Sequence, residues 1–156
     1  MVRSWTRPLI VAGLQTRPLV TRPPRPLLDD GVRWTSEELQ KLQADDRDIG
    51  PVVVLLKQNQ RPPRESIGSE NPELKNYWAQ WESLSMVDGL VYRNFHRPDG
   101  TSKYLQLLIP RSVRPAFLEM VHARASGHFS WRMNQDQVQR RAYWASWKTD
   151  TKLCCA

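Results

Sequence analysis

Cysteine is scarce in this sequence, and its two copies, Cys154 and Cys155, stand side by side near the end of the chain. Two adjacent cysteines cannot supply the several crosslinks of a disulfide framework. Their scarcity fits a protein of a reducing compartment, where thiols stay reduced. The class of small, disulfide-linked secreted folds is therefore excluded.

Long apolar runs are also missing. No stretch of about eighteen apolar residues occurs, so we expect no transmembrane helix and no membrane partner. The amino terminus lacks the apolar core of a secretory signal. We therefore expect an intracellular protein, in either the nucleus or the cytoplasm. Its 156 residues, 40% of them hydrophobic, allow one domain of ordinary size or two very small ones.

Catalytic motifs are absent as well. The sequence has no glycine-rich phosphate loop, no nucleophile elbow and no H-E-x-x-H pair. Most of its 16 acidic residues fall in segments predicted to be solvated helices. We therefore expect no enzymatic activity and no small-molecule substrate.

Charge is present but unevenly distributed. Residues 1–28 contain five arginines and no acidic residue, residues 29–96 carry −4, and residues 97–156 carry +6, within a total of +7. A basic surface attracts polyanions and gives a salt-dependent affinity for nucleic acid. The basic ends therefore favour DNA as a partner, although many basic proteins bind no nucleic acid specifically.

Residues 1–30 form an arginine- and proline-rich arm that we expect to be disordered. The sequence Thr-Arg-Pro-Leu-Ile at 6–10 is echoed by Thr-Arg-Pro-Leu-Val at 16–20. Proline at this density opposes both a helix and a central strand. Two other interpretations stay open, which are docking of polyproline segments on an aromatic groove and an organelle transit peptide.

Residues 34–86 predict a connector of three short helices. The first begins at Thr35 or Ser36, either of which can cap it. The second spans 48–58, and a cluster of prolines and charges separates it from the third, at 71–84. The aromatic face of the third helix is interpreted as core packing, and its apolar positions are Leu74, Tyr77, Trp78, Trp81 and Leu84.

A β-hairpin is predicted next, at the start of a segment that spans residues 87–156. Strand-forming residues at 89–95 and 103–109 flank an Asp-Gly pair at 99–100, which is typical of a tight turn. A lone hairpin must pack against another element to be stable. His96, in one arm, is interpreted as an ordinary surface histidine.

Two helices follow the hairpin. Ser112 is placed to cap the first, whose apolar side brings His122 to its carboxyl end. Asn134 is placed to cap the second, which is expected to include Ala142. We expect Trp144 in the core and the neighbouring arginines on the surface.

Two stretches in this region resemble a known family. Gly-His-Phe-Ser-Trp at 127–131 and Gln-Val-Gln-Arg-Arg-Ala-Tyr-Trp-Ala-Ser-Trp at 137–147 resemble the amino-terminal zinc-binding domain of gypsy-type LTR retrotransposon integrases. The resemblance implies a small helical domain in which two histidines and a C-x-x-C hold one zinc ion. His122 and His128 match the two histidines.

The resemblance extends upstream of these motifs. Asp-Ile-Gly-Pro at 48–51 and Trp-Ala-Gln-Trp at 78–81 resemble the connector between ribonuclease H and integrase in gypsy-type Pol polyproteins, so the similarity covers residues 34–156. Integrases carry out DNA integration with an acidic triad that holds two metal ions on a ribonuclease-H-like domain. The chain ends before such a domain begins, which predicts a fragment without catalytic activity.

The chain departs from the family pattern at three points. Ser130 stands where the family has glycine, and Ala145 stands where it has proline. In the family's register the C-x-x-C begins just beyond Ala156, which predicts a product truncated before its zinc site is complete. Cys154 and Cys155 then belong to the final helix.

The candidate zinc ligands are His122, His128, Cys154 and Cys155. Successive side chains tend to point apart, so two adjacent cysteines hold one ion poorly. We therefore expect zinc at low occupancy, with the cysteines as the weaker half of the set. An alternative stays open in which one cysteine, the two histidines and a water molecule form the site.

The predicted fold class is α+β, mainly α, with short helices, one β-hairpin and a small helical zinc-binding domain at 87–156, incomplete at its end. The predicted function is that of a retrotransposon-derived integrase zinc-binding fragment that at most binds DNA weakly or self-associates. The alternative is a metal-free host protein-interaction scaffold derived from a retrotransposon. The residues expected to contact nucleic acid are Arg132, Arg140, Arg141 and Lys148.

Overall fold

The computed structural model describes residues 34–67, 71–124 and 131–154. These residues form six α-helices and a four-stranded sheet, so the predicted α+β, mainly α, class is confirmed. The arm predicted at 1–30 lies outside them. Among the described helices, none combines the length and the apolar character needed to span a bilayer.

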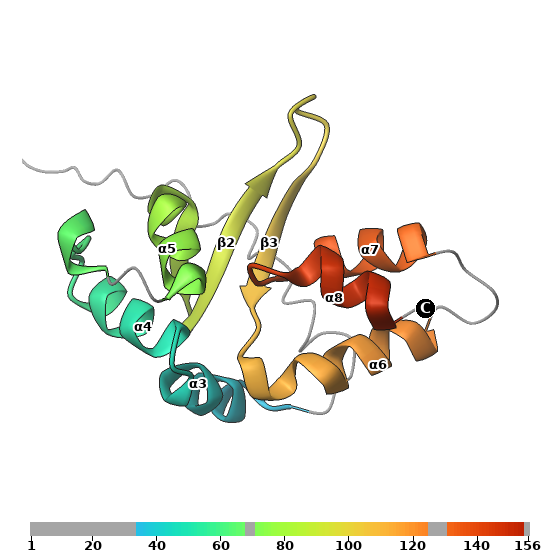
Figure 1. Cartoon of the computed structure of the whole chain (residues 1–156), viewed down its shortest axis with the longest axis horizontal. Helices are drawn as coiled ribbons and strands as arrows, with labels where there is room; N and C mark the ends of the chain where they lie inside the picture. The colour runs from blue at the N-terminus through green and yellow to red at the C-terminus, as the bar shows by residue number, and fades with distance from the viewer. Residues whose placement is uncertain (1–33, 68–70, 125–130, 155–156) are drawn as a thin grey trace, which may run out of the picture.

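The strands β2 and β3 form a hairpin that stands between two groups of helices, with its turn projecting from the body (Figure 1). One group precedes the hairpin in sequence and the other follows it. The elements are α3 (Ser36–Asp45), α4 (Ile49–Lys57), α5 (Pro72–Ala79), β1 (Leu84–Val87), β2 (Leu90–His96), β3 (Lys103–Leu108), α6 (Arg114–Arg124), α7 (Trp131–Gln139), β4 (Ala142–Tyr143) and α8 (Trp147–Cys154).

The first helix begins at the predicted cap, and the third begins where the sequence predicted its start. The Thr35 hydroxyl accepts a hydrogen bond from the Glu38 amide at 3.1 Å, and the Glu38 carboxylate accepts one from the Thr35 amide at 2.7 Å. This reciprocal pair is a capping box. At α5 the Asn71 side chain accepts from the Leu74 amide at 2.9 Å, and Pro72 occupies the first turn. Helix α4 lies within the predicted range 48–58.

The third predicted helix is shorter than expected, and a strand replaces its end. Helix α5 stops at Ala79, a 3-10 turn covers Trp81–Ser83, and Leu84 begins β1. The cause is a tight turn at Asp88 and Gly89, whose φ angles are 52° and 82°. An Asp-Gly turn of this kind suits a two-residue hairpin, so β1 pairs with β2 and buries Leu84 in the sheet.

The sheet has the strand order β1-β2-β3-β4, which adds two strands to the predicted hairpin. The pairs β1–β2 and β2–β3 are antiparallel, whereas β4 runs parallel to β3. Ala142 therefore lies in β4, opposite Leu107, and its predicted place in a helix is wrong. The Leu107 amide donates to the Arg141 carbonyl at 2.9 Å, and the Ile109 amide donates to the Tyr143 carbonyl at 3.2 Å.

Two predicted helix caps after the hairpin are also wrong. Ser112 lies inside a 3-10 turn, Arg111–Val113, that leads directly into α6. Asn134 lies within α7, and only 2% of it is exposed. Its side chain is engaged with α6, so a tertiary contact and not the local chain decides its role. Trp144 is fully buried, as predicted.

Hydrogen bonds from a buried side-chain amide connect helix α3 to the sheet. The Gln43 side chain is fully buried, and its Nε2 donates to the Val91 carbonyl at 3.1 Å and to the Leu108 carbonyl at 2.8 Å. Its Oε1 accepts from the Val91 amide at 2.9 Å. These bonds satisfy buried backbone groups. One buried hydrophobic cluster contains residues from both sides of the predicted domain boundary between residues 86 and 87, and that boundary stays a prediction. Members of this cluster include Leu39, Ile49, Val52, Tyr77, Leu90, Leu108, Phe117, Val138 and Trp144.

A cluster of buried and half-buried charges joins the two helix groups. Arg111 Nη2 lies 2.6 Å from a carboxylate oxygen of Asp48 and 2.6 Å from one of Glu73, and Arg114 Nη2 lies 2.6 Å from the other Glu73 oxygen. The Asp48 side chain is fully buried, and those of Glu73 and Arg114 are 8% and 9% exposed. Asn71 adds a hydrogen bond of 2.7 Å to Asp48.

The two carboxylates of this cluster differ in acidity. Burial works to raise the pKa of Asp48, but hydrogen bonds, led by that from Arg111, outweigh it and hold the pKa below its usual value. Burial raises the pKa of Glu73 above its usual value, although the hydrogen bond from Arg114 opposes the rise. Glu73 is therefore the member of the pair that takes up a proton first as the pH falls.

Replacing Arg114 with methionine is expected to destabilise the protein by about 3 kcal/mol at neutral pH, because Glu73 loses its buried cation and keeps only Arg111, whose side chain is 52% exposed. The measurement is urea unfolding followed by circular dichroism. The raised pKa of Glu73 determines how this loss of stability depends on pH. The difference in unfolding free energy between the wild type and the variant should be largest above that pKa. It should shrink as the pH falls through the pKa, because a protonated carboxyl needs no cation.

The matched control is Glu82→Gln, which breaks an ion pair with Arg61 in which the Glu82 side chain is 86% exposed. A change within about 0.5 kcal/mol is expected there. An Arg114→Met protein as stable as the wild type at neutral pH would show that the buried cluster does not hold the helix groups together.

Candidate zinc and nucleic-acid site

The helices α6, α7 and α8 pack against one another and carry the candidate zinc ligands. Phe117 of α6 contacts Trp144 edge to face, with ring centroids 6.1 Å apart at 83°. The Trp144 indole donates to the Asp150 carboxylate at 2.7 Å, and the Ser146 hydroxyl donates to the same carboxylate oxygen at 2.8 Å. These contacts fix the start of α8 on the core. We call these three helices the helical triplet.

His122 lies in the last turn of α6 and is exposed. Its Nδ1 lies 3.3 Å from the side-chain nitrogen of Asn134, which is buried in α7. A zinc-bound imidazole commonly uses its second nitrogen for such an outer contact. Zinc on Nε2 requires a proton on Nδ1, so the Asn134 amide would have to present its oxygen to His122. Rotating the amide by half a turn achieves this, since the two ends of an amide group are alike in shape.

Cys154 is the last described residue of α8 and is exposed. Helices α6 and α8 contact each other, and Figure 1 places the end of α8 near the carboxyl end of α6. His122 and Cys154 therefore belong to the same end of the helical triplet. The structure includes Cys154 in the final helix, as the family register predicts. One imidazole nitrogen and one thiolate are donors that zinc accepts.

The other two candidate ligands, His128 and Cys155, lie outside the described residues. Within the ranges 34–67, 71–124 and 131–154, no group of three or more His, Cys, Asp or Glu side chains is arranged to hold a metal ion. A structural zinc site needs four donors. The described residues thus supply two donors at one end of the helical triplet, and the complete ligand set stays a prediction.

The four residues predicted to contact nucleic acid lie in two places. Arg132 is exposed in the first turn of α7, and Arg140 is exposed just beyond its end, about 12 Å along the helix axis at 1.5 Å per residue. Arg141 is half-buried, and its guanidinium bonds the Gln137 carbonyl at 2.9 Å. Lys148 is exposed in the first turn of α8, with its amine 5.6 Å from the centroid of the Trp147 ring.

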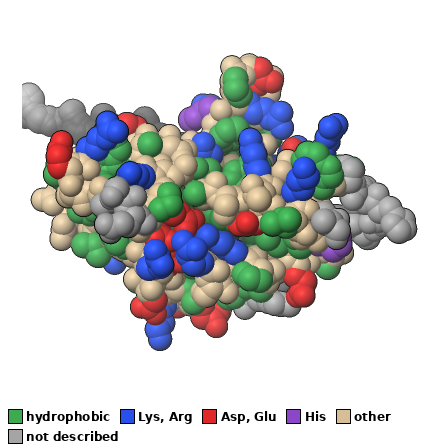
Figure 2. Space-filling model, in the orientation of Figure 1, with side chains coloured by type: hydrophobic (Ala, Val, Ile, Leu, Met, Phe, Trp, Pro, Cys, Tyr) green, Lys and Arg blue, Asp and Glu red, His purple; other side chains and the backbone are tan. Residues whose placement is uncertain are grey.

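The hairpin adds basic residues that were not among the predicted contacts. Arg97 of the hairpin turn lies 3.5 Å from Asp136 of α7, which also binds Arg140 at 2.7 Å. The hairpin therefore lies beside the end of α7, and Figure 2 shows Lys and Arg side chains along both. Arg93 lies in β2, and Arg97 directly follows that strand. Their separation of four positions matches the spacing of side chains on one strand face, and it is the sequence signal that could have identified them.

A comparison with protein families identifies a match to this part of the structure. Residues 109–156 match the integrase zinc binding domain. The matched segment starts at the end of β3 and includes the helical triplet, His122, His128, Cys154 and Cys155. No curated protein and no solved structure matches the chain. The match supports an origin in a retroelement integrase, and the resemblance of residues 34–108 to a polyprotein connector stays a prediction.

Proposed function

We propose that this protein is a non-catalytic module derived from a gypsy-type Pol polyprotein, which binds DNA weakly and self-associates. The observation that carries the proposal is the helical triplet, which matches the integrase zinc binding domain and places His122 and Cys154 at one end. Zinc would link the end of α6 to the end of α8. The segment upstream, with its helices and hairpin, supports the helical triplet from the other side of the sheet.

DNA binding is supported by the charge on the carboxyl-terminal part of the chain. Residues 97–156 carry +6, and the described face beside the hairpin presents Lys and Arg side chains (Figure 2). Arg132, Arg140 and Lys148 are exposed, so phosphates can reach them. Lysine and arginine contacts to phosphates give binding without sequence preference and with a strong dependence on salt. The interaction is therefore proposed to be weak at physiological salt.

The proposed lack of catalysis is supported by how two acidic side chains of the helical triplet, Asp136 and Asp150, are used. The Asp136 carboxylate pairs with Arg140 and Arg97, and the Asp150 carboxylate accepts hydrogen bonds from Trp144 and Ser146. Two-metal strand transfer needs carboxylates that converge on the ions. Carboxylates held by arginine or by an indole do not serve that purpose.

A second candidate function is a metal-free protein-interaction scaffold. Large apolar side chains are exposed at the start of α7 and at the end of α8. In α7, Trp131 is 37% exposed and Met133 47%, and in α8, Leu153 is 68% exposed. Exposed apolar residues mark many protein-binding surfaces. The two functions differ in their response to zinc, because the scaffold needs none.

Zinc is expected to bind weakly and at low occupancy through the histidines. His122→Ala and His128→Ala should each abolish the residual binding, whereas His96→Ala, which changes an exposed histidine of β2, should leave it intact. The measurement is a titration against a chromophoric chelator, with far-UV circular dichroism before and after chelation. Undiminished zinc in the His128→Ala protein would contradict the proposed site.

The cysteines are tested in the same titration. The double change Cys154→Ser and Cys155→Ser should leave the weak zinc binding unchanged if both residues act only as part of the final helix. A complete loss of zinc in this variant would show instead that a cysteine is a true ligand. It would favour the site formed by one cysteine, two histidines and a water molecule.

DNA binding is expected to depend on four cations. Changing Arg132, Arg140, Arg141 and Lys148 together to glutamine should weaken binding to a short duplex at least about tenfold and lower the slope of log K against log salt by about 3. The measurement is fluorescence anisotropy at several salt concentrations. The matched control changes four exposed cations of the upstream segment to glutamine, namely Lys41, Lys57, Arg64 and Lys75. Equal losses in both variants would show that only net charge matters.

No strand cleavage or joining is expected from the purified protein with either Mg²⁺ or Mn²⁺. Labelled DNA ends incubated with it should be recovered unchanged on a denaturing gel. Metal-dependent products that disappear in Asp136→Asn would contradict the proposal. That substitution keeps the shape of the side chain and removes its charge.

A further inference from the structure

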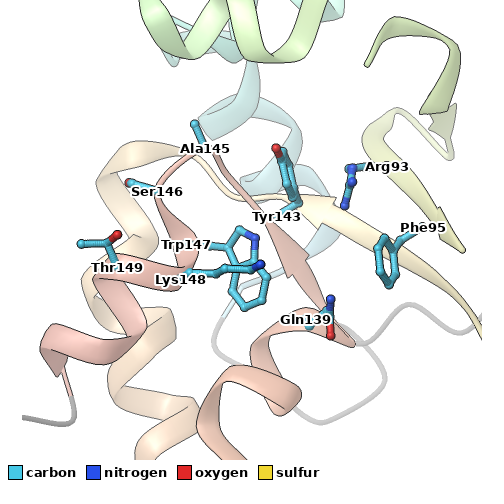
Figure 3. A pocket seen from close by; sticks show the side chains of 9 residues that line it. All are labelled: Arg93, Phe95, Gln139, Tyr143, Ala145, Ser146, Trp147, Lys148 and Thr149. Atoms are coloured by element: carbon cyan, nitrogen blue, oxygen red, sulfur yellow. The ribbon is translucent and has the colours of Figure 1, made fainter. Parts of the chain in front are cut away.

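A hollow of about 430 Å³ lies between the hairpin and the start of α8. Figure 3 shows its lining, to which β2 gives Arg93 and Phe95, the end of α7 gives Gln139, and α8 gives Trp147 and Lys148. Its size falls in the range of about 300 to 1,000 Å³ that is usual for ligand sites. The hollow is remote from the candidate zinc ligands, because it adjoins the start of α8 whereas Cys154 ends that helix.

Aromatic rings form the walls of this hollow. Phe95 and Trp147 come from different elements and lie on opposite sides of the space in Figure 3, with Tyr143 between them at the top. Phe95 already stacks on Tyr104, with centroids 6.0 Å apart and planes at 10°. The Arg93 guanidinium lies 5.2 Å from the centroid of the Phe95 ring, so a flat ring entering the hollow would meet Phe95 and this cation together. Bases of single-stranded nucleic acid bind in this way on aromatic side chains, with little sequence preference.

A cation without a carboxylate partner lines the same space. Arg93 is half-buried, and its guanidinium donates to Gln80 Oε1 at 2.5 Å and to Gln106 Oε1 at 2.7 Å. It also lies 4.3 Å from the centroid of the Tyr143 ring. Among the described residues, no Asp or Glu is within ion-pair distance of Arg93, and burial lowers its pKa. A phosphate entering the hollow would supply the missing negative charge.

Gln139 and Lys148 add polar side chains to the lining. In the part of the chain that the structure describes, the Gln139 amide makes no hydrogen bond, while its backbone carbonyl accepts one from Gln106 at 2.6 Å. An amide can both donate to and accept from the edge of a base. Lys148 is exposed at the rim and can reach a phosphate outside the hollow.

We propose that this hollow binds one unpaired nucleotide of a single-stranded nucleic acid, with the base against Phe95 and the phosphate beside Arg93 and Lys148. The inference rests on the proposed nucleic-acid binding and narrows it to strands with unpaired bases. A base inside a duplex has both faces stacked and its edge paired, so it cannot enter. Arg93 and Lys148 hold the backbone, Phe95 holds the base and Gln139 meets its edge.

The test compares three fluorescent oligomers of equal length by anisotropy: oligothymidine, the same backbone without bases, which has the same charge, and a duplex. The wild type is expected to bind oligothymidine about tenfold more tightly than the abasic strand, which corresponds to stacking of one base. Phe95→Leu should remove most of this preference and leave duplex binding unchanged. The matched control is Trp131→Leu, which removes an exposed ring at the start of α7 and should change nothing.

A second variant tests the inference independently if the Phe95→Leu protein does not fold. Gln139→Ala removes a half-buried amide that bonds no described residue, and it should weaken oligothymidine binding about threefold without affecting the abasic strand. Equal binding of oligothymidine and the abasic strand by the wild type would overturn the inference, and so would a preference that survives both substitutions. Duplex binding that remains would then leave the proposed DNA binding standing, whereas no binding to any oligomer would overturn both.

Discussion

The arrangement of the two helix groups depends on four buried or half-buried charges, those of Asp48, Glu73, Arg111 and Arg114. Each guanidinium meets a carboxylate from the upstream group, so the start of α4, the first turn of α5 and the entry to α6 meet at one point. A cluster of this kind gains little net stability after desolvation, but it strongly disfavours any arrangement that separates its members. It therefore fixes which helices meet, and with them the position of the helical triplet on the sheet.

Local chemistry allowed some elements to be predicted from sequence and left others hidden. The capping box at Thr35 and the Asn71 cap are short-range bonds, so the starts of α3 and α5 could be predicted. The helical spacing of apolar residues continues to Leu84 and so predicted a helix that is too long. The turn at Asp88 and Gly89 instead pairs the segment before it with β2, and Leu84 lies in β1. Strand β4 could not be foreseen, since two residues become a strand only where β3 offers its edge.

Some features of the candidate site could likewise be predicted from the sequence, and others could not. The family resemblance predicted His122, and the periodicity of α6 placed it at the end of that helix. Its contact with Asn134 was hidden, because an asparagine near a helix start is ordinarily a cap and only the packing of α6 on α7 turns it toward the histidine. The hollow beside Arg93 was hidden too. Its walls come from segments about fifty residues apart, and only the tertiary fold brings them together.

Strand β4 also bears on how this sequence can be inherited in pieces. The segment that matches the integrase zinc binding domain begins at Ile109, yet β4 within it completes a sheet whose other strands all lie upstream. A recombination event that moved residues 109–156 alone would carry the candidate ligands but leave behind the edge that pairs with Ala142 and Tyr143. It would also separate Arg111 and Arg114 from Asp48 and Glu73. The upstream helices, the hairpin and the helical triplet therefore form one structural unit, and the breakpoint that best preserves it lies before α3.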